Sequence, residues 1–104
     1  MLDNTGYAKV IDFGLATALP ESGDLAQTFC GTTCYIAPEI LKGDGYDKMV
    51  DWWSIGIILY EMLFGFTPFY DRSKAKIYEN IKKKKLLFPS QVTVPHSYQA
   101  RDLI

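Results

Sequence analysis

The longest apolar stretch of the chain runs from about Lys48 to Phe64 and predicts a helix. Apolar residues recur there at three- and four-residue spacing, and others fill the positions between them. A helix that is apolar on nearly every face is typical of a buried helix. Gly65 and Pro68 follow and predict its end. The pattern therefore places a buried helix at the centre of the fold.

Shorter patterns predict three further elements. Two apolar runs, 1–3 and 7–11, flank the turn sequence Asn4-Thr5-Gly6 and predict a β-hairpin. A second helix is predicted from Ser73, its N-cap, to about Lys84. Its inner face is predicted to consist of Ala75, Ile77, Tyr78 and Ile81. Residues 97–104 have the composition of the first turns of another helix, so the predicted fold class is mainly α with a short β-hairpin.

The segment 15–36 has no clean periodicity and predicts a long loop. It contains Gly, Ser, Thr and Pro at irregular intervals. A loop of this length inside a compact domain is usually functional or mobile. We therefore expect part of the function to lie in it.

Composition restricts the function classes. The chain has 104 residues, 48% of them hydrophobic, which is enough for a packed core in one domain or less. The net charge of −1 gives no electrostatic argument for nucleic-acid binding. The N-terminus lacks the pattern of a signal peptide. The most apolar run, Ile55 to Tyr60, is far shorter than the ~20 residues of a membrane span.

The two cysteines, Cys30 and Cys34, are too few for a disulfide framework. Reduced thiols are typical of the cytoplasm or the nucleus, which is the predicted location. A redox pair formed by these two residues is the alternative that the spacing leaves open.

Three motifs follow one another along the chain. They are Asp12-Phe13-Gly14, Ala37-Pro38-Glu39 and the run 51–56, DWWSIG, with a Thr-rich loop between the first two. Each alone is weak, but in this order they resemble the C-terminal lobe of a protein kinase. The resemblance covers essentially all of residues 1–104 and implies a partial kinase domain with an α+β parent fold. The N-terminal lobe and the catalytic loop would then lie outside these residues.

Asp12 is the strongest catalytic candidate. Phosphoryl transfer needs a metal ion held by an acidic side chain, and a carboxylate on a tight turn suits that role. The resemblance implies that Asp12 holds Mg²⁺ and, with Gly14, contributes to the ATP site. Gly14 allows a close backbone approach, and the packing of Phe13 can differ between active and inactive states. An ordinary turn aspartate is the alternative.

The segment Thr28-Phe29-Cys30-Gly31-Thr32 resembles the activation segment of the AGC group of Ser/Thr kinases. The resemblance implies that an upstream kinase phosphorylates Thr28, since a phosphate adds about −2 charge and three acceptor oxygens that order a loop. A solvated loop threonine is the alternative. The resemblance further implies that Thr32 supports catalysis by bridging the catalytic base and a lysine, and that the substrates are proteins with Ser or Thr acceptors.

The resemblance assigns the remaining candidates to binding and support. Tyr35, Ile36 and Pro38 would form the pocket for the residue after the phosphoacceptor. Glu39 would pair with an arginine further along the parent chain. Asp51 would hold the catalytic loop, and Trp53, like Trp52, would be structural.

Some positions depart from the AGC pattern. Thr33 and Cys34 stand where these kinases usually have Pro and Glu, so a preference for basic substrates does not follow. Thr17 stands where many relatives have a lysine that helps to bind the loop phosphate. Regulation through Thr28 is therefore expected to be weaker or to depend more on an upstream arginine.

Three hypotheses follow for the function. The first is a segment of a Ser/Thr kinase that uses ATP and Mg²⁺, inactive by itself because the catalytic base is missing. The second is a non-catalytic decoy that binds kinase partners or substrates through residues 35–39 and the helix Ser73–Lys84. The third is an incomplete gene model.

The basic run Lys82–Lys85 is expected to be a solvated helix end rather than an acidic-partner site.

Overall fold

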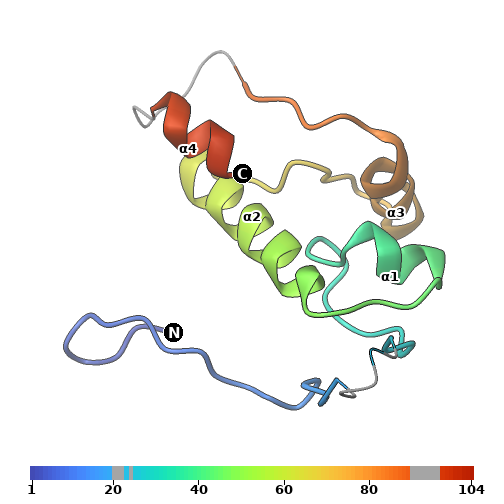
Figure 1. Cartoon of the computed structure of the whole chain (residues 1–104). Helices are drawn as coiled ribbons and strands as arrows, with labels where there is room; N and C mark the ends of the chain where they lie inside the picture. Colours follow the sequence, from blue (N-terminus) through green and yellow to red (C-terminus); the bar gives the residue numbers. More distant parts are fainter. Residues whose placement is uncertain (20–22, 24, 90–96) are drawn as a thin grey trace.

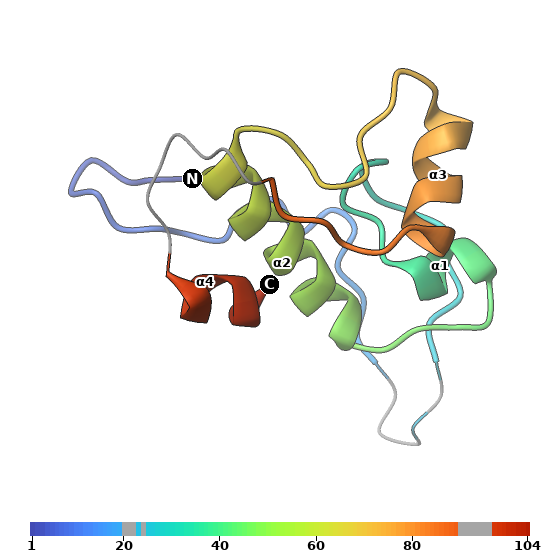
Figure 2. The same ribbon diagram turned by 90° about the horizontal axis from the view of Figure 1, so that it is seen from above.

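The fold is known from a computed structural model that describes residues 1–19, 23, 25–89 and 97–104. The described part contains four helices: α1 (Pro38–Lys42), α2 (Met49–Phe64), α3 (Lys74–Lys83) and α4 (Tyr98–Leu103). Figure 1 shows α2 in the centre, with α1 and α3 together on one side of it and α4 near its C-terminal half. Figure 2, seen from above, shows the same arrangement with α4 and α3 on opposite sides of α2.

The helix predicted from Lys48 to Phe64 is confirmed as α2, with Lys48 at its N-cap. It ends at Gly65, which has a φ of 82° and donates its backbone N–H to the carbonyl of Glu61 at 2.8 Å. A residue with a side chain is strained in that left-handed conformation, so glycine is the natural terminator here. The end of α2 is therefore set locally by Gly65 and does not depend on tertiary packing.

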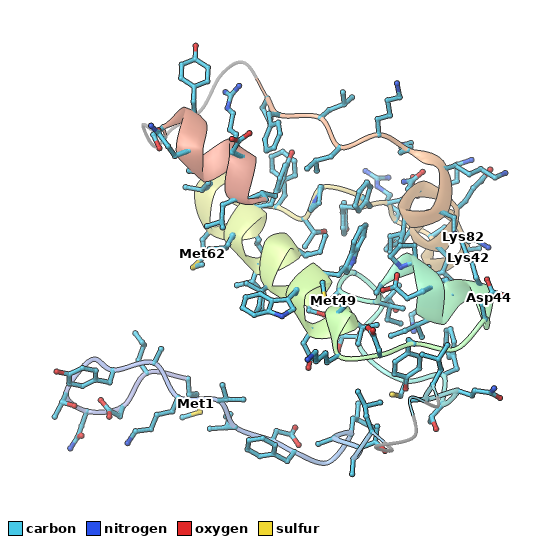
Figure 3. All side chains as sticks on the ribbon, viewed as in Figure 1. Met1, Lys42, Asp44, Met49, Met62 and Lys82 are labelled. Atoms are coloured by element: carbon cyan, nitrogen blue, oxygen red, sulfur yellow. The ribbon has the colours of Figure 1, made fainter. Side chains whose placement is uncertain are left out.

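The prediction that α2 is a buried helix is confirmed for part of its surface only. Ile57 and Tyr60 are its buried residues, whereas Trp52 is 64% exposed. Ile55, Ile58 and Met62 share the exposed side, and Figure 3 shows Met62 pointing away from α1 and α3. The reason is that the described elements leave part of the apolar surface of α2 uncovered. None of the described helices has both the length and the apolarity that crossing a membrane requires.

The core lies between α2 and α3. It consists of Ile57, Phe69, Ile77 and Ile81, with partly buried side chains packed against it, among them Trp53 and Leu41. Ile77 and Ile81 confirm part of the predicted inner face of α3, and Tyr78 is half-buried. Ala75 is exposed, so its placement on that face was wrong. Its place is taken by Asn80, which is 2% exposed and lies with the two isoleucines on one side of the helix.

Asn80 connects α3 to the loop after α2. Its Nδ2 donates to the carbonyl of Phe69 at 3.2 Å, so the amide fixes the segment that carries the core phenylalanine. We expect Asn80→Ala to lower the free energy of unfolding by about 1–3 kcal/mol, because a buried carbonyl loses its partner. Glu79→Ala removes two exposed ion pairs with Lys76 and Lys83 on the same helix and is the matched control, expected to cost clearly less because solvent screens such pairs. Urea denaturation of the folded kinase domain measures both, and equal losses would contradict the role of Asn80.

Ser73 is the N-cap residue of α3 as predicted, but its side chain accepts no capping hydrogen bond. Its backbone N–H instead donates to Oδ1 of Asp71 at 3.1 Å.

The helix predicted in 97–104 is confirmed as α4. Ser97 caps it, because its side-chain Oγ accepts a hydrogen bond from the N–H of Ala100 at 3.2 Å.

A second cluster lies at the C-terminal end of α2. The rings of Tyr60, Phe64 and Phe88 lie 4.4 to 5.9 Å apart, and the Tyr60 hydroxyl donates to the carbonyl of Leu87 at 2.9 Å. The guanidinium of Arg101 from α4 lies 5.4 Å from the centre of the Phe88 ring. This cation–π contact links α4 to the segment after α3.

The predicted hairpin at residues 1–11 is confirmed as a chain reversal, although its pairing is limited to one bridge between Leu2 and Ala8. The N–H groups of Asp3 and Lys9 donate to the carbonyls of Tyr7 and Met1 at 2.9 and 2.8 Å. The Asp3 carboxylate accepts from Thr5 and Tyr7 and pairs with Lys9, and these partners lower the pKa of Asp3 to about 2. The reversal therefore delivers residues 10–14 toward α2.

Candidate functional site

A pocket of about 660 Å³ lies where residues 10–19 pass the start of α2 and the loop before α1. It collects side chains from segments far apart in the sequence. Five of the candidate catalytic, binding and supporting residues line it: Asp12, Thr32, Tyr35, Ile36 and Asp51. Gly14, Thr28, Pro38, Glu39 and Trp53 are not among its lining residues.

Asp12 has an unusual backbone. Its φ of 62° is the one positive value of a non-glycine residue in the part of the chain that the structure describes. Its Oδ1 accepts a hydrogen bond from the N–H of Gly14 at 3.3 Å, and a Cβ added at Gly14 would lie only 3.2 Å from that oxygen. Strained backbone is concentrated at functional sites, so the turn favours a functional role for this carboxylate.

The carboxylate of Asp12 is available as one ligand for a metal ion. Over the described residues, no group of three or more His, Cys, Asp or Glu side chains is close enough to hold a metal. Mg²⁺ is usually bound by one or two carboxylates together with water and phosphate oxygens. Asp12 is exposed and lines the pocket, so it can supply one such ligand.

Tyr35 is held to α2 at two points. Its hydroxyl donates to Oε2 of Glu61 at 2.7 Å, and its carbonyl accepts from Oγ of Ser54 at 3.0 Å. The hydrogen bond to the Glu61 carboxylate raises the pKa of Tyr35 above its usual value of 10. This side of the pocket is therefore fixed to the central helix.

We expect Tyr35→Phe to lower the free energy of unfolding by about 1–3 kcal/mol, because Glu61 loses a short hydrogen bond. The raised pKa means that the folded state keeps the phenolic proton longer than the unfolded state does. The stabilisation is thus fully present below pH 10 and is lost as the pH rises through the higher folded pKa. The free energy of unfolding of the folded kinase domain, wild type and Tyr35→Phe, is measured between pH 8 and 11. The difference between the two should shrink at the alkaline end, and a constant difference would contradict this prediction.

The remaining candidates lie around the pocket. Trp53 stacks on Phe69 with ring centres 5.9 Å apart and planes 7° apart, which agrees with a structural role, although its Nε1 is buried without a hydrogen-bond partner in the described residues. Pro38 and Glu39 form the first turn of α1, and Glu39 accepts from Gly43 through its carbonyl. Asp51 lies in the first turn of α2, exposed. Thr28 is exposed in the preceding loop.

Sequence reasoning missed Ser54, Glu61 and Tyr46. Glu61 had a local signal, because it is a charged residue in the apolar second half of the helix. Ser54 and Tyr46 had none, since their partners Tyr35 and Thr28 are 19 and 18 residues away along the chain.

Comparison with known proteins identifies the family. Residues 1–104 match the protein kinase domain family. The chain is 48% identical over 104 residues to "Serine/threonine protein kinase ypkA" of Aspergillus fumigatus, covering 100% of this chain and 16% of that protein. It is 49% identical over 89 residues to "cAMP-dependent protein kinase type 3" of Saccharomyces cerevisiae, covering 86% of this chain and 22% of the relative.

A third relative is "Serine/threonine-protein kinase Sgk1" of Homo sapiens, 45% identical over 93 residues, with 89% of this chain and 22% of the relative covered. The chain thus spans between about a sixth and about a fifth of the length of these three relatives. The match to the family over all 104 residues agrees with the order of the three motifs. The chain belongs to the protein kinase domain family, and its relatives are Ser/Thr kinases of the AGC type.

Proposed function

We propose that this chain is the segment of a Ser/Thr protein kinase that carries a metal-binding aspartate, a regulatory loop and the first helices of the C-terminal lobe. The enzyme transfers the γ-phosphate of ATP to Ser or Thr hydroxyls of protein substrates. The observation that supports this most is the pocket that Asp12, Thr32, Tyr35, Ile36 and Asp51 line together. Three segments of the chain, around residue 12, at residues 32–36 and around residue 51, converge there at one cavity.

Asp12 would hold Mg²⁺, and Gly14 would let the ATP phosphates approach the turn. When bound, the metal ion neutralises charge on the transferred phosphoryl group. Asp12 itself contributes a carboxylate whose direction is fixed by the Gly14 N–H. Thr32 lines the same pocket, and its hydroxyl would bridge the catalytic base and a lysine.

Tyr35, Ile36 and Pro38 would bind the substrate residue after the phosphoacceptor. Ile36 is 3% exposed and Tyr35 is fixed through Glu61 and Ser54, so this part is preorganised. Glu39, Asp51 and Trp53 would support the surrounding elements. Preorganised binding groups lower the cost of orienting a substrate.

Thr28 would be the site at which an upstream kinase regulates the enzyme, and its exposed position makes it accessible. The two described cysteines are free, which suits the cytoplasm or the nucleus. A general base is a further requirement for transfer, and the resemblance assigns it to residues outside these 104. The 104 residues by themselves are therefore expected to be inactive.

A non-catalytic decoy is the second candidate function. The exposed apolar side of α2, with Trp52, Ile55, Ile58 and Met62, favours it, because apolar surface of this kind binds partners. Such a protein would bind kinases or substrates without transferring phosphate.

Phosphate transfer by the native polypeptide tests the proposal. The polypeptide carrying this sequence is purified from its source and incubated with γ-labelled ATP, Mg²⁺ and a mixed library of Ser, Thr and Tyr peptides. Label on Ser and Thr peptides is the expected result. Label on Tyr peptides alone would overturn the Ser/Thr assignment, and binding without any transfer would favour the decoy.

A further inference from the structure

We propose that Tyr46 is a positioning residue that holds the Thr28 loop in place before any phosphate is added to it. The proposal rests on the proposed function, since it concerns the regulation of the same kinase. Its basis is a set of contacts between residues 25–30 and residues 45–46, here called the Tyr46 latch. Neither Tyr46 nor Gly45 belongs to any of the three motifs.

The first contact of the latch is a pair of backbone hydrogen bonds. The N–H of Ala26 donates to the carbonyl of Tyr46 at 2.9 Å, and the N–H of Tyr46 donates back to the carbonyl of Ala26 at 2.9 Å. Two reciprocal bonds of this length are those of a closely paired antiparallel bridge. Residue 26 is therefore fixed by backbone pairing although it lies outside the described helices.

The second contact is made by the Tyr46 side chain. Its hydroxyl donates to the carbonyl of Thr28 at 2.8 Å, and the Sγ of Cys30 lies 3.9 Å from the same hydroxyl. The side chain of Tyr46 thus spans residues 28 to 30. The Thr28 side chain remains exposed, so the backbone is held while the hydroxyl stays open to modification.

The third contact depends on Gly45. Its φ is +87°, and an added Cβ would lie 2.7 Å from Cβ and 3.0 Å from Cδ1 of Leu25. Real Cβ atoms do not approach another carbon so closely, so Leu25 can lie here only because residue 45 is glycine. Gly45 is buried beneath the loop.

The other side of the loop packs against α3. The ring of Phe29 meets the ring of Tyr78 edge to face, with centres 6.2 Å apart and planes at 89°. The loop is therefore held from two directions, by residues 45–46 and by α3.

If contacts already hold the loop in its active arrangement, phosphorylation of Thr28 increases the population of that arrangement less. If the active arrangement is populated without phosphate, the phosphate can raise its population only slightly. Weakening the latch lowers that starting population and increases the effect of phosphorylation. The latch therefore sets how strongly activity depends on Thr28.

The test uses the full-length kinase in phosphatase-treated and Thr28-phosphorylated forms. Tyr46→Phe removes the hydroxyl that reaches Thr28 and keeps the ring. Tyr98→Phe removes a hydroxyl from a side chain that is 87% exposed and is the matched control. Gly45→Ala is a second variant that displaces Leu25 by steric contact rather than by loss of a hydrogen bond.

Amide hydrogen exchange is the first measurement. In the unphosphorylated wild type, the N–H groups of Ala26 and Tyr46 should be protected. Tyr46→Phe should speed exchange in residues 25–30 by about two- to tenfold, the range for loss of one hydrogen bond, while amides of α2 keep their rates. Exchange of Ala26 at the rate of an unstructured peptide, or equal rates in Tyr46→Phe and Tyr98→Phe, would overturn the latch. This measurement needs no catalysis, so it decides the latch even if the proposed kinase function fails.

The ratio of kcat/KM between phosphorylated and unphosphorylated enzyme is the second measurement. Tyr46→Phe and Gly45→Ala should raise that ratio by about two- to tenfold over wild type, and Tyr98→Phe should leave it unchanged. A general loss of stability would lower both forms alike and leave the ratio where it was. If this ratio is unchanged in an active kinase, the regulatory role of Tyr46 is overturned, while the proposed kinase function stands.

Discussion

Replacing Asp12 by asparagine in the full-length kinase is expected to abolish most of its phosphate transfer while leaving the fold intact. The carboxylate is proposed to hold the metal ion, and losing one preorganised electrostatic group at a reacting centre costs about 100- to 1,000-fold in kcat. Asparagine keeps an oxygen that can accept from the Gly14 N–H, and it tolerates the φ of 62° better than most residues do. The variant therefore changes the charge and little else.

The measurement is the steady-state rate of peptide phosphorylation at saturating ATP over a series of Mg²⁺ concentrations. Asp102→Asn, at an exposed position of α4, is the control for loss of one negative charge and should keep its activity. Thermal unfolding of both variants checks that the fold is retained. An Asp12→Asn enzyme with wild-type rates and wild-type Mg²⁺ dependence would contradict the assignment of Asp12.

The isolated 104-residue chain is expected to lack a cooperative unfolding transition. Its accessible surface is 8230 Å², whereas a folded protein of this mass exposes about 5,900 Å². Its radius of gyration is 15.4 Å, against about 13 Å for a compact domain of this length. The chain is thus more open than a self-contained domain.

The open shape corresponds to apolar surface that no described element covers. Trp52, Ile58 and Met62 on α2 are 64%, 45% and 65% exposed, and Phe13 in the first segment is 70% exposed. Exposed apolar area of this kind favours aggregation or partner binding over a unique monomeric fold. Stability should come only when other parts of a kinase cover these faces.

Thermal melting followed by circular dichroism tests this expectation. The isolated chain should melt broadly and bind a hydrophobic dye such as ANS, while the full-length kinase should melt sharply. A monomer of 104 residues with a sharp two-state transition and no dye binding would contradict it.

Local signals in the sequence predicted the elements well. The position of α2 follows from its apolar run and from Gly65, whose conformation ends the helix. The turn at residues 4–6 follows from its own turn residues, and Asp3 stabilises it through neighbours at most six positions away. The helix α1 was missed because it has five residues, which is too short for a periodic pattern.

Burial was harder to predict because it depends on what lies opposite. The apolar pattern of α2 predicts a buried helix but does not say which positions are covered; Ile57 is buried in the core with Phe69, and Tyr60 is buried against Phe64 and Phe88. Asn80 was not predicted in the core, because its partner is a backbone carbonyl eleven positions earlier. Helix propensity carries no information about a hydrogen bond between Asn80 and the carbonyl of Phe69.

The pocket itself was not predicted. Asp12, Asp51, Thr32, Tyr35 and Ile36 were candidates for separate roles, and the structure brings them to one cavity. The hydrogen bonds of Tyr35 with Glu61 and of Tyr46 with Thr28 join positions 26 and 18 residues apart. Only the folded chain reveals these pairs, and they provide the residues for the proposed regulation.

The intact mass of the native polypeptide tests most directly the claim that these residues work as one segment of a larger kinase. An antibody against the 104 residues recovers the polypeptide from its source, and mass spectrometry gives its mass without digestion. The account predicts a mass several times 11.8 kDa, since the relatives are several times longer than this chain. A native polypeptide of 11.8 kDa alone would contradict it, and the protein would then have to act by binding a partner.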